Sequence, residues 1–203
     1  MEPTIDLIRH GEPQGGRRYR GQTDHPLTER GWDQMWAAVG RHRPWTRIVT
    51  SPLIRCAGFA DALGQAMGLG VERDPDLMEV GYGTWSGRSP EELRREDPEG
   101  FAAFRRDPWR NRPEGAEAME DFTARVLRSF EAHRAAADGP LLIVAHAGVL
   151  RTVIADALLM PLEFLYRIQV PYAGRVRLTY PEGYPRISHL APFPPEREDH
   201  HAG

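Results

Sequence analysis

Short apolar runs along the chain have the pattern of buried β-strands. Three of them lie at residues 4–8, 46–50 and 141–145, and the last reads Leu-Leu-Ile-Val-Ala without a polar break. A continuous apolar run is expected of a strand that is buried on both faces, as in a parallel sheet covered by helices. Two later runs, at 174–180 and 186–190, are predicted to be strands near an edge of the same sheet.

Between these strands, apolar residues recur at the spacing of one helix face. Helices are predicted at residues 28–39, 53–67, 117–137 and 149–159. Thr28 stands where it can cap the first helix, and glycine or proline follows each of the other three. The chain therefore alternates strand and helix over most of its length.

This order of elements predicts an α/β fold: a three-layer sandwich with a mostly parallel central sheet flanked by helices. The 203 residues suffice for one domain with a sizeable core, which we expect over residues 1–193. Residues 82–115 carry four prolines and many charges, with little apparent core. We interpret them as an excursion of short helices over the carboxyl edge of the sheet, and residues 194–203 as a disordered tail.

Composition and charge narrow the classes of function. Hydrophobic residues make up 40% of the chain and the net charge is -3, so no overall basic field exists to attract nucleic acid. No apolar run has the length of a membrane span, and the first residues lack the pattern of a signal peptide. Cys56 is the single cysteine, so no internal disulfide can form. We expect a cytoplasmic protein without nucleic-acid or membrane partners, of unknown oligomeric state.

Polar segments follow three of the predicted strands directly. The first contains Arg9 and His10, the second ends at Arg55, and the third begins at His146. Ligands of parallel α/β sheets bind at the carboxyl ends of the strands, so these four side chains are expected to converge. Guanidinium groups repel cations but match phosphate oxygens, which favours a phosphate site without a metal. The helix opening at 147–148 would add backbone N–H groups.

Each of these residues also has an ordinary structural explanation when taken alone. A single histidine after a strand is most often a capping or core residue, and Arg9 alone would be a surface arginine. Glu79 alone would be a carboxylate in an exposed turn. The prediction of a site depends on the shared position of the segments and on their common chemistry.

Several motifs in order resemble the histidine phosphatase superfamily, which includes the phosphoglycerate mutases. The first is Arg-His-Gly-Glu at 9–12. The resemblance extends from Ile5 to about Tyr180, and one short motif would be weak evidence whereas the ordered set is specific. The other matching segments are 21–31, 51–55, 77–87 and 146–149.

The resemblance implies a role for each site residue. His10 resembles the nucleophile, and Arg9, Arg55 and His146 resemble the groups that hold the phosphoryl group being transferred. Glu79 resembles the general acid that protonates the leaving oxygen. A nucleophilic histidine must be neutral, and two arginines supply the positive charge that phosphoryl transfer requires, without a cofactor. Further substrate contacts are expected from Gln22, Thr23, Ala147 and Gly148.

The sequence departs from the family pattern at two places. Many relatives have an asparagine six residues after the nucleophile, where this chain has Gly16, which puts one phosphate or substrate contact in doubt. The stretch after Arg55 also differs and contains Cys56. We interpret Cys56 as a buried structural thiol and not as a second nucleophile.

The phosphatase branch of the family fits better than the mutase branch, because the excursion after Glu79 is short and would leave the site open to water. Looser similarities point to the alpha-ribazole phosphatases of cobalamin assembly. Trp85 and Trp109 could stack on a flat base or could pack the excursion. We expect a phosphomonoester hydrolase acting through a phosphohistidine on a small metabolite. The alternatives are a mutase, a broad sugar-phosphate or nucleotide phosphatase, and a weakly catalytic phosphate-binding regulatory module.

Overall fold

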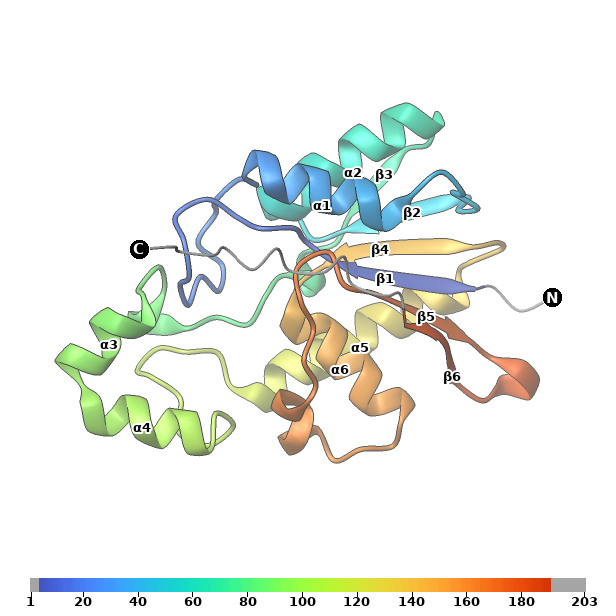
Figure 1. The fold of residues 1–203 in the computed structure, drawn as a ribbon. Helices are drawn as coiled ribbons and strands as arrows, with labels where there is room; N and C mark the ends of the chain where they lie inside the picture. The colour runs from blue at the N-terminus through green and yellow to red at the C-terminus, as the bar shows by residue number, and fades with distance from the viewer. Residues whose placement is uncertain (1–3, 191–203) are drawn as a thin grey trace, which may run out of the picture.

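The structure, a computed structural model, describes residues 4–190 and contains a six-stranded sheet (Figure 1). Four strands are parallel, while β5 runs antiparallel to β1 and β6 antiparallel to β5. The prediction of a mostly parallel sheet is confirmed. Across the sheet the order is β3 (Val71–Arg73), β2 (Arg47–Thr50), β4 (Leu141–Ala145), β1 (Ile5–Arg9), β5 (Arg175–Thr179) and β6 (Arg186–Leu190).

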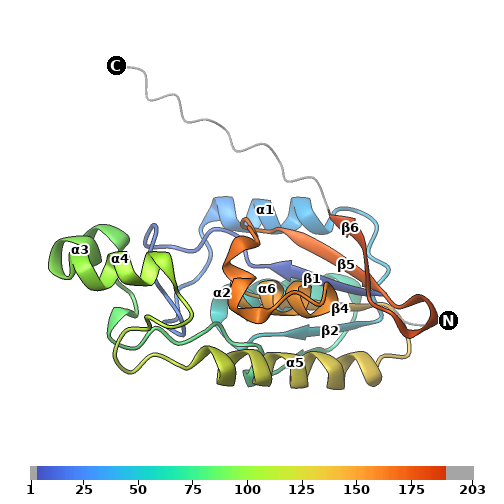
Figure 2. The ribbon, with the colours of Figure 1, turned by 90° about the horizontal axis from the view of Figure 1, so that it is seen from below.

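Helices cover both faces of the sheet, as the predicted three-layer sandwich requires. Helices α1 (Glu29–Val39) and α2 (Ile54–Met67) cover one face, and α5 (Met119–Ala135) and α6 (Ala147–Ala157) cover the other (Figures 1 and 2). Each face has its own apolar cluster, and the strands β1, β2 and β4 contribute side chains to both. The continuous apolar pattern of the strands follows from this burial on two sides.

The helix boundaries agree with the capping signals in the sequence. The Thr28 hydroxyl accepts a hydrogen bond from the Gly31 N–H at 2.9 Å, so Thr28 caps α1 as predicted. Gly68 ends α2 in the left-handed conformation, which glycine adopts without strain. Helix α6 begins at Ala147, two residues before the expected start, and His146 is its N-cap.

Strand β3 was not predicted from the sequence. It is three residues long, and Glu72 and Arg73 are exposed, so it has no apolar run to reveal it. Of the two late strands, β6 forms the edge of the sheet. Strand β5 lies inside it, paired on both sides, and its burial alternates along the strand.

The excursion at 82–115 lies beyond the carboxyl ends of the strands in both views (Figures 1 and 2). It contains the predicted short helices, η2 (Gly83–Trp85), α3 (Pro90–Glu96) and α4 (Pro98–Arg106). The expectation that it has little core was wrong, because aromatic residues widely spaced in sequence meet there. Its own apolar cluster consists of Trp85, Leu93, Phe101 and Phe104, with Tyr19 and Tyr82 packed against it.

Three further 3₁₀ turns complete the fold: η1 (Pro75–Leu77), η3 (Leu162–Arg167) and η4 (Pro181–Gly183). Within residues 4–190, none of the helices combines the length and the apolar character needed to cross a membrane. The tail expected at 194–203 falls outside the described residues.

Candidate active site

The ends of β1, β2 and β4 bring three polar side chains together. In the register of the sheet, Arg9 pairs with Ala145 and Thr50 pairs with Val144, so the residues that follow emerge at the same edge. The rings of His10 and His146 lie 5.3 Å apart, centroid to centroid, in an edge-to-face arrangement. The Ser51 hydroxyl lies 2.7 Å from Nε2 of His146. The predicted convergence of the two histidines is therefore observed.

His10 is held as a neutral imidazole with one free nitrogen. Its Nδ1 lies 2.7 Å from the carbonyl oxygen of Gly11. A carbonyl can only accept, so the proton resides on Nδ1 and Nε2 keeps its lone pair. Burial lowers the pKa of His10 well below its ordinary value, and the charges of Arg9 and Arg55 lower it further. This is the protonation state that a nucleophile needs at neutral pH.

The glycine that follows His10 is required by close backbone packing. A Cβ on Gly11 would lie 2.2 Å from the carbonyl oxygen of Gly31, and one on Gly31 would lie 2.2 Å from that of Glu12. The Thr28 N–H also donates to the Glu12 carbonyl at 2.9 Å. The start of α1 therefore presses directly on the segment that carries His10.

Arg9 and Arg55 are fixed through backbone carbonyls and leave donors unused. Arg9 donates to the Val170 carbonyl at 2.6 Å. Arg55 is 1% exposed and donates to the carbonyls of Thr23 at 2.8 Å and Gly21 at 2.6 Å. The Nε of each arginine is buried without a hydrogen-bond partner. An unsatisfied buried donor is costly, so both groups are suited to receive an anion.

His146 is also buried and neutral. Burial lowers its pKa well below the ordinary value, with Arg55 as the next cause. The Sγ of Cys56 lies 3.6 Å from its Nε2 and 3.3 Å from the Ala145 carbonyl oxygen. Burial raises the pKa of the Cys56 thiol, which keeps it protonated and unreactive. Its predicted assignment as a buried structural thiol agrees with this environment.

Glu79 reaches the same edge from the segment before the excursion. One carboxylate oxygen accepts the Gly148 N–H at 3.2 Å, and the other accepts the Val80 N–H at 3.0 Å. Arg125 fixes this segment by donating to the carbonyl of Met78 at 2.9 Å and by pairing with Glu117 at 2.6 Å. Glu79 therefore lies at the first turn of α6, and its charge acts on Arg9.

The other predicted contact residues are placed less directly. Gln22 is exposed, and its side-chain amide donates to the Glu79 carbonyl at 3.4 Å. Thr23 contributes its carbonyl to Arg55. Ala147 is buried in the first turn of α6. The N–H of Gly148, which we expected to face the phosphate, is instead the donor to Glu79.

Comparison with known proteins identifies the family. Residues 5–191 match the sequence profile of the Histidine phosphatase superfamily (branch 1). The chain belongs to this superfamily.

Several similar proteins are named as phosphatases. The chain is 33% identical over 190 residues, covering 91% of it and 94% of the relative, to an adenosylcobalamin/alpha-ribazole phosphatase of Salmonella typhimurium. A putative alpha-ribazole-5'-P phosphatase of Escherichia coli has a similar structure, with a TM-score of 0.82, 28% identity and coverage of 94% and 96%. A mycobacterial glucosyl-3-phosphoglycerate phosphatase solved with VO3 is also similar, with a TM-score of 0.80 and 28% identity. The match covers 93% of this chain and 98% of that structure. This chain is a phosphatase of the histidine phosphatase type.

Three residues near His10 were missed in the sequence. Ser51 contacts His146, and the ring of Tyr172 lies 5.9 Å from that of His10 and 4.1 Å from the Arg9 guanidinium carbon. Arg20 is 7% exposed, and its Nε has no partner. Ser51 could have been suspected, because it follows a predicted strand. Arg20 stands among arginines in a polar loop, and no pattern in the sequence distinguishes it.

The two tryptophans of the excursion have packing roles. Trp85 is 8% exposed, and its ring lies 5.1 Å from that of Phe104. The Trp109 indole N–H donates to Glu120 at 2.7 Å, and its ring packs against the apolar cluster on the α5–α6 face. Of the two explanations considered for these tryptophans in this histidine phosphatase, stacking on a flat base and packing, the contacts support packing.

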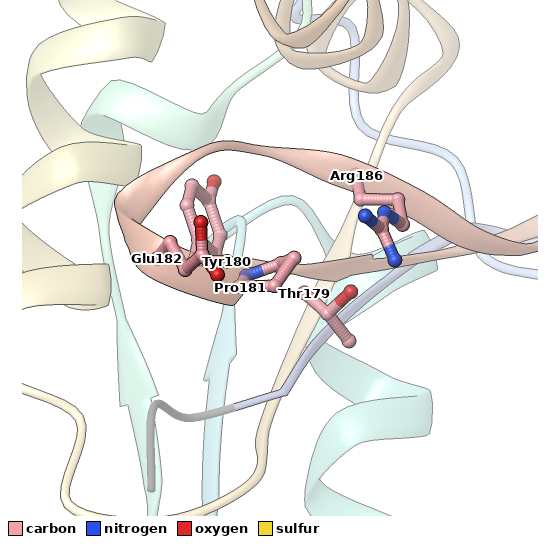
Figure 3. A pocket seen from close by; sticks show the side chains of 5 residues that line it. All are labelled: Thr179, Tyr180, Pro181, Glu182 and Arg186. Carbon is pink, nitrogen blue, oxygen red and sulfur yellow. The ribbon is translucent and has the colours of Figure 1, made fainter.

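A separate hollow of about 420 Å³ lies in the β5–β6 hairpin, lined by residues such as Tyr180 and Arg186 (Figure 3). It belongs to the opposite end of the sheet from His10, because Leu178 pairs with Ile5, where β1 begins. Within 4–190, no three histidine, cysteine or acidic side chains are grouped to hold a metal ion.

Proposed function

We propose that this histidine phosphatase hydrolyses a phosphomonoester through a phosphohistidine at His10. The observation that supports this most directly is the state of His10: neutral, with a free Nε2, among arginines whose Nε donors have no partner. Nε2 would attack phosphorus and form an N–P bond while the P–O bond to the leaving group breaks. Water would then cleave the N–P bond, releasing inorganic phosphate and the free imidazole.

The surrounding residues would divide the remaining tasks. Arg9 and Arg55 would bind the non-bridging oxygens, where negative charge must be stabilised, and His146 would bind the same group from α6. Glu79, once protonated, would donate its proton to the leaving oxygen. No metal ion is needed in this scheme. Further substrate contacts are assigned to Gln22, Thr23 and Ala147, and not to Gly148, whose N–H donates to Glu79.

The substrate we propose first is alpha-ribazole phosphate, because the relative with 33% identity over 190 residues is named for that activity. A second candidate is a sugar-linked phosphoglycerate, supported by the glucosyl-3-phosphoglycerate phosphatase of similar fold. Both are small phosphomonoesters, and the chemistry at His10 would be the same for each.

A panel of phosphorylated metabolites tests this proposal. The purified chain should release phosphate from p-nitrophenyl phosphate, and one of the two candidate metabolites should give the highest kcat/KM. The panel includes 3-phosphoglycerate with its bisphosphate primer, for which we expect negligible 2-phosphoglycerate. Efficient interconversion would replace the hydrolase with a mutase, and binding without any turnover would replace it with a regulatory module.

A further inference from the structure

Arg20 is buried in the loop between β1 and α1 although it carries a full charge. Only 7% of the residue is exposed, and it forms no ion pair with a carboxylate in the described part of the chain. One terminal nitrogen donates to the carbonyls of Gln14 at 2.7 Å, Pro13 at 3.4 Å and Gly16. Its Nε is buried and has no partner. Neutral carbonyls do not compensate the charge of a buried guanidinium, so a further partner is expected.

The position of Arg20 relates it to the phosphate site. The Tyr172 hydroxyl interacts with the guanidinium groups of both Arg9 and Arg20. The positive charges of Arg20 and Arg55 act on each other, and both act on His10. Arg20, Arg9 and Arg55 each have a buried Nε without a partner, as Arg112 and Arg175 do, but these three are the arginines whose charges act on His10.

Three like charges around one neutral histidine are unfavourable unless an anion lies between them. An oxyanion with several acceptor atoms would satisfy all three donors at once. The arrangement therefore points to a ligand with more negative charge than two arginines would neutralise.

We propose that Arg20 is a third phosphate-binding arginine, and that with Arg9 and Arg55 it selects the dianion of a terminal phosphomonoester. Arg9 reaches the anion from β1, Arg55 from α2, and Arg20 from the loop between β1 and α1. A phosphodiester carries one charge fewer and gains less from the third arginine. This inference rests on the proposed phosphohydrolase function, and it adds a residue that the motifs of the sequence do not contain.

Arg18 offers a matched control on the same loop. It also donates to backbone carbonyls, those of Gly15 at 2.7 Å and Gly87 at 2.8 Å, but it is exposed. A variant of Arg18 therefore loosens the loop without removing a charge next to His10. Comparing Arg20→Gln with Arg18→Gln separates phosphate binding from loop support, and Arg20→Lys tests whether the charge alone suffices.

The experiment measures kcat/KM for p-nitrophenyl phosphate, inhibition by vanadate and the melting temperature for the wild type and these three variants. Arg20→Gln should lose about 10- to 100-fold in kcat/KM and in vanadate affinity, as expected for hydrogen bonds to a charged group. Arg18→Gln should change both by less than about 3-fold, since surface substitutions have small effects. Arg20→Lys should recover part of the vanadate affinity, because the charge is kept and the fork is lost.

Wild-type vanadate affinity in a folded Arg20→Gln variant would overturn the inference. Equal losses in Arg20→Gln and Arg18→Gln would also overturn it, because they would assign Arg20 to loop support. If Arg20→Gln does not fold, Arg20→Lys decides: vanadate affinity no better than that of an Arg55→Gln variant contradicts the proposal. An inactive wild type would refute the proposed function itself, whereas an active wild type with an unaffected Arg20→Gln refutes this inference alone.

Discussion

Replacing Glu79 with glutamine tests its proposed role as the general acid. The carboxylate uses both oxygens, accepting from the Gly148 N–H at 3.2 Å and from the Val80 N–H at 3.0 Å. A glutamine has one acceptor oxygen, so one of these N–H groups loses its partner. An unsatisfied donor of this kind costs about 1–3 kcal/mol. For a chain of this size each kcal/mol lowers the melting temperature by about 2–4 °C.

The catalytic effect should depend on the leaving group. An alkyl phosphate expels a basic alkoxide, so Glu79→Gln should reduce the rate of enzyme phosphorylation by a factor on the order of 10²–10⁴. p-Nitrophenyl phosphate expels a phenolate that is stable without a proton, and its first step should be affected far less. Rapid-quench measurements of the first turnover separate this step from later attack of water on the phosphohistidine.

The control is Glu114→Gln, which removes an exposed carboxylate of the excursion at 82–115. It should leave both rates near those of the wild type. If Glu79→Gln slows phosphorylation by both substrates equally, Glu79 is not the general acid. The Glu114→Gln rates then decide whether Glu114 is the acid instead, and Glu117, whose carboxylate is paired with Arg125, is the candidate after it.

Three further predictions concern the two buried histidines, the hydroxyl of Ser51 and the absence of a metal requirement. The pKa values of His10 and His146 are lowered in the folded state, so below about pH 6.5 only the unfolded chain binds these two protons. The free energy of unfolding should therefore fall as the pH falls, and a urea midpoint that rises from pH 7 to 5 would contradict this. Ser51→Ala leaves Nε2 of His146 without its 2.7 Å partner and should cost about 1–3 kcal/mol of unfolding free energy; an unchanged urea midpoint would count against it. Activity should survive EDTA and be inhibited by vanadate; rescue of a chelated enzyme by zinc or magnesium would refute metal independence.

The positions of Arg9, His10 and His146 could be predicted because each lies at the carboxyl end of a parallel strand: Arg9 ends β1, His10 follows it, and His146 follows β4. Because the strands pair in parallel, the residues at their carboxyl ends share one edge of the sheet. The strands themselves are recognised by their continuous apolar runs, which follow from burial on both faces. The sequence could not reveal that Nδ1 of His10 contacts its own neighbour's carbonyl. That contact depends on a backbone path fixed by the packing of Gly11 against Gly31.

Other features depend on contacts between distant segments. The aromatic core of the excursion joins Trp85 with Phe104. The prolines and charged residues between them interrupt any apolar pattern from which this core could be predicted. Gly148 was expected to bind phosphate with its N–H, but Glu79, 69 positions earlier, occupies that donor. No pattern in the sequence distinguishes Arg20 from the neighbouring arginines, because the carbonyls that surround it are brought there by the fold of the loop. Such pairings are set by tertiary packing and leave no local pattern.

In the proposed mechanism, phosphate is carried on His10 during turnover. Enzyme mixed with ³²P-labelled substrate, quenched with alkali and digested, should yield one labelled peptide whose phosphate is acid-labile and bound to His10. The label should be absent from His10→Ala, a variant that should remain folded and lose turnover. Label on another residue, or wild-type turnover by His10→Ala, would contradict the account.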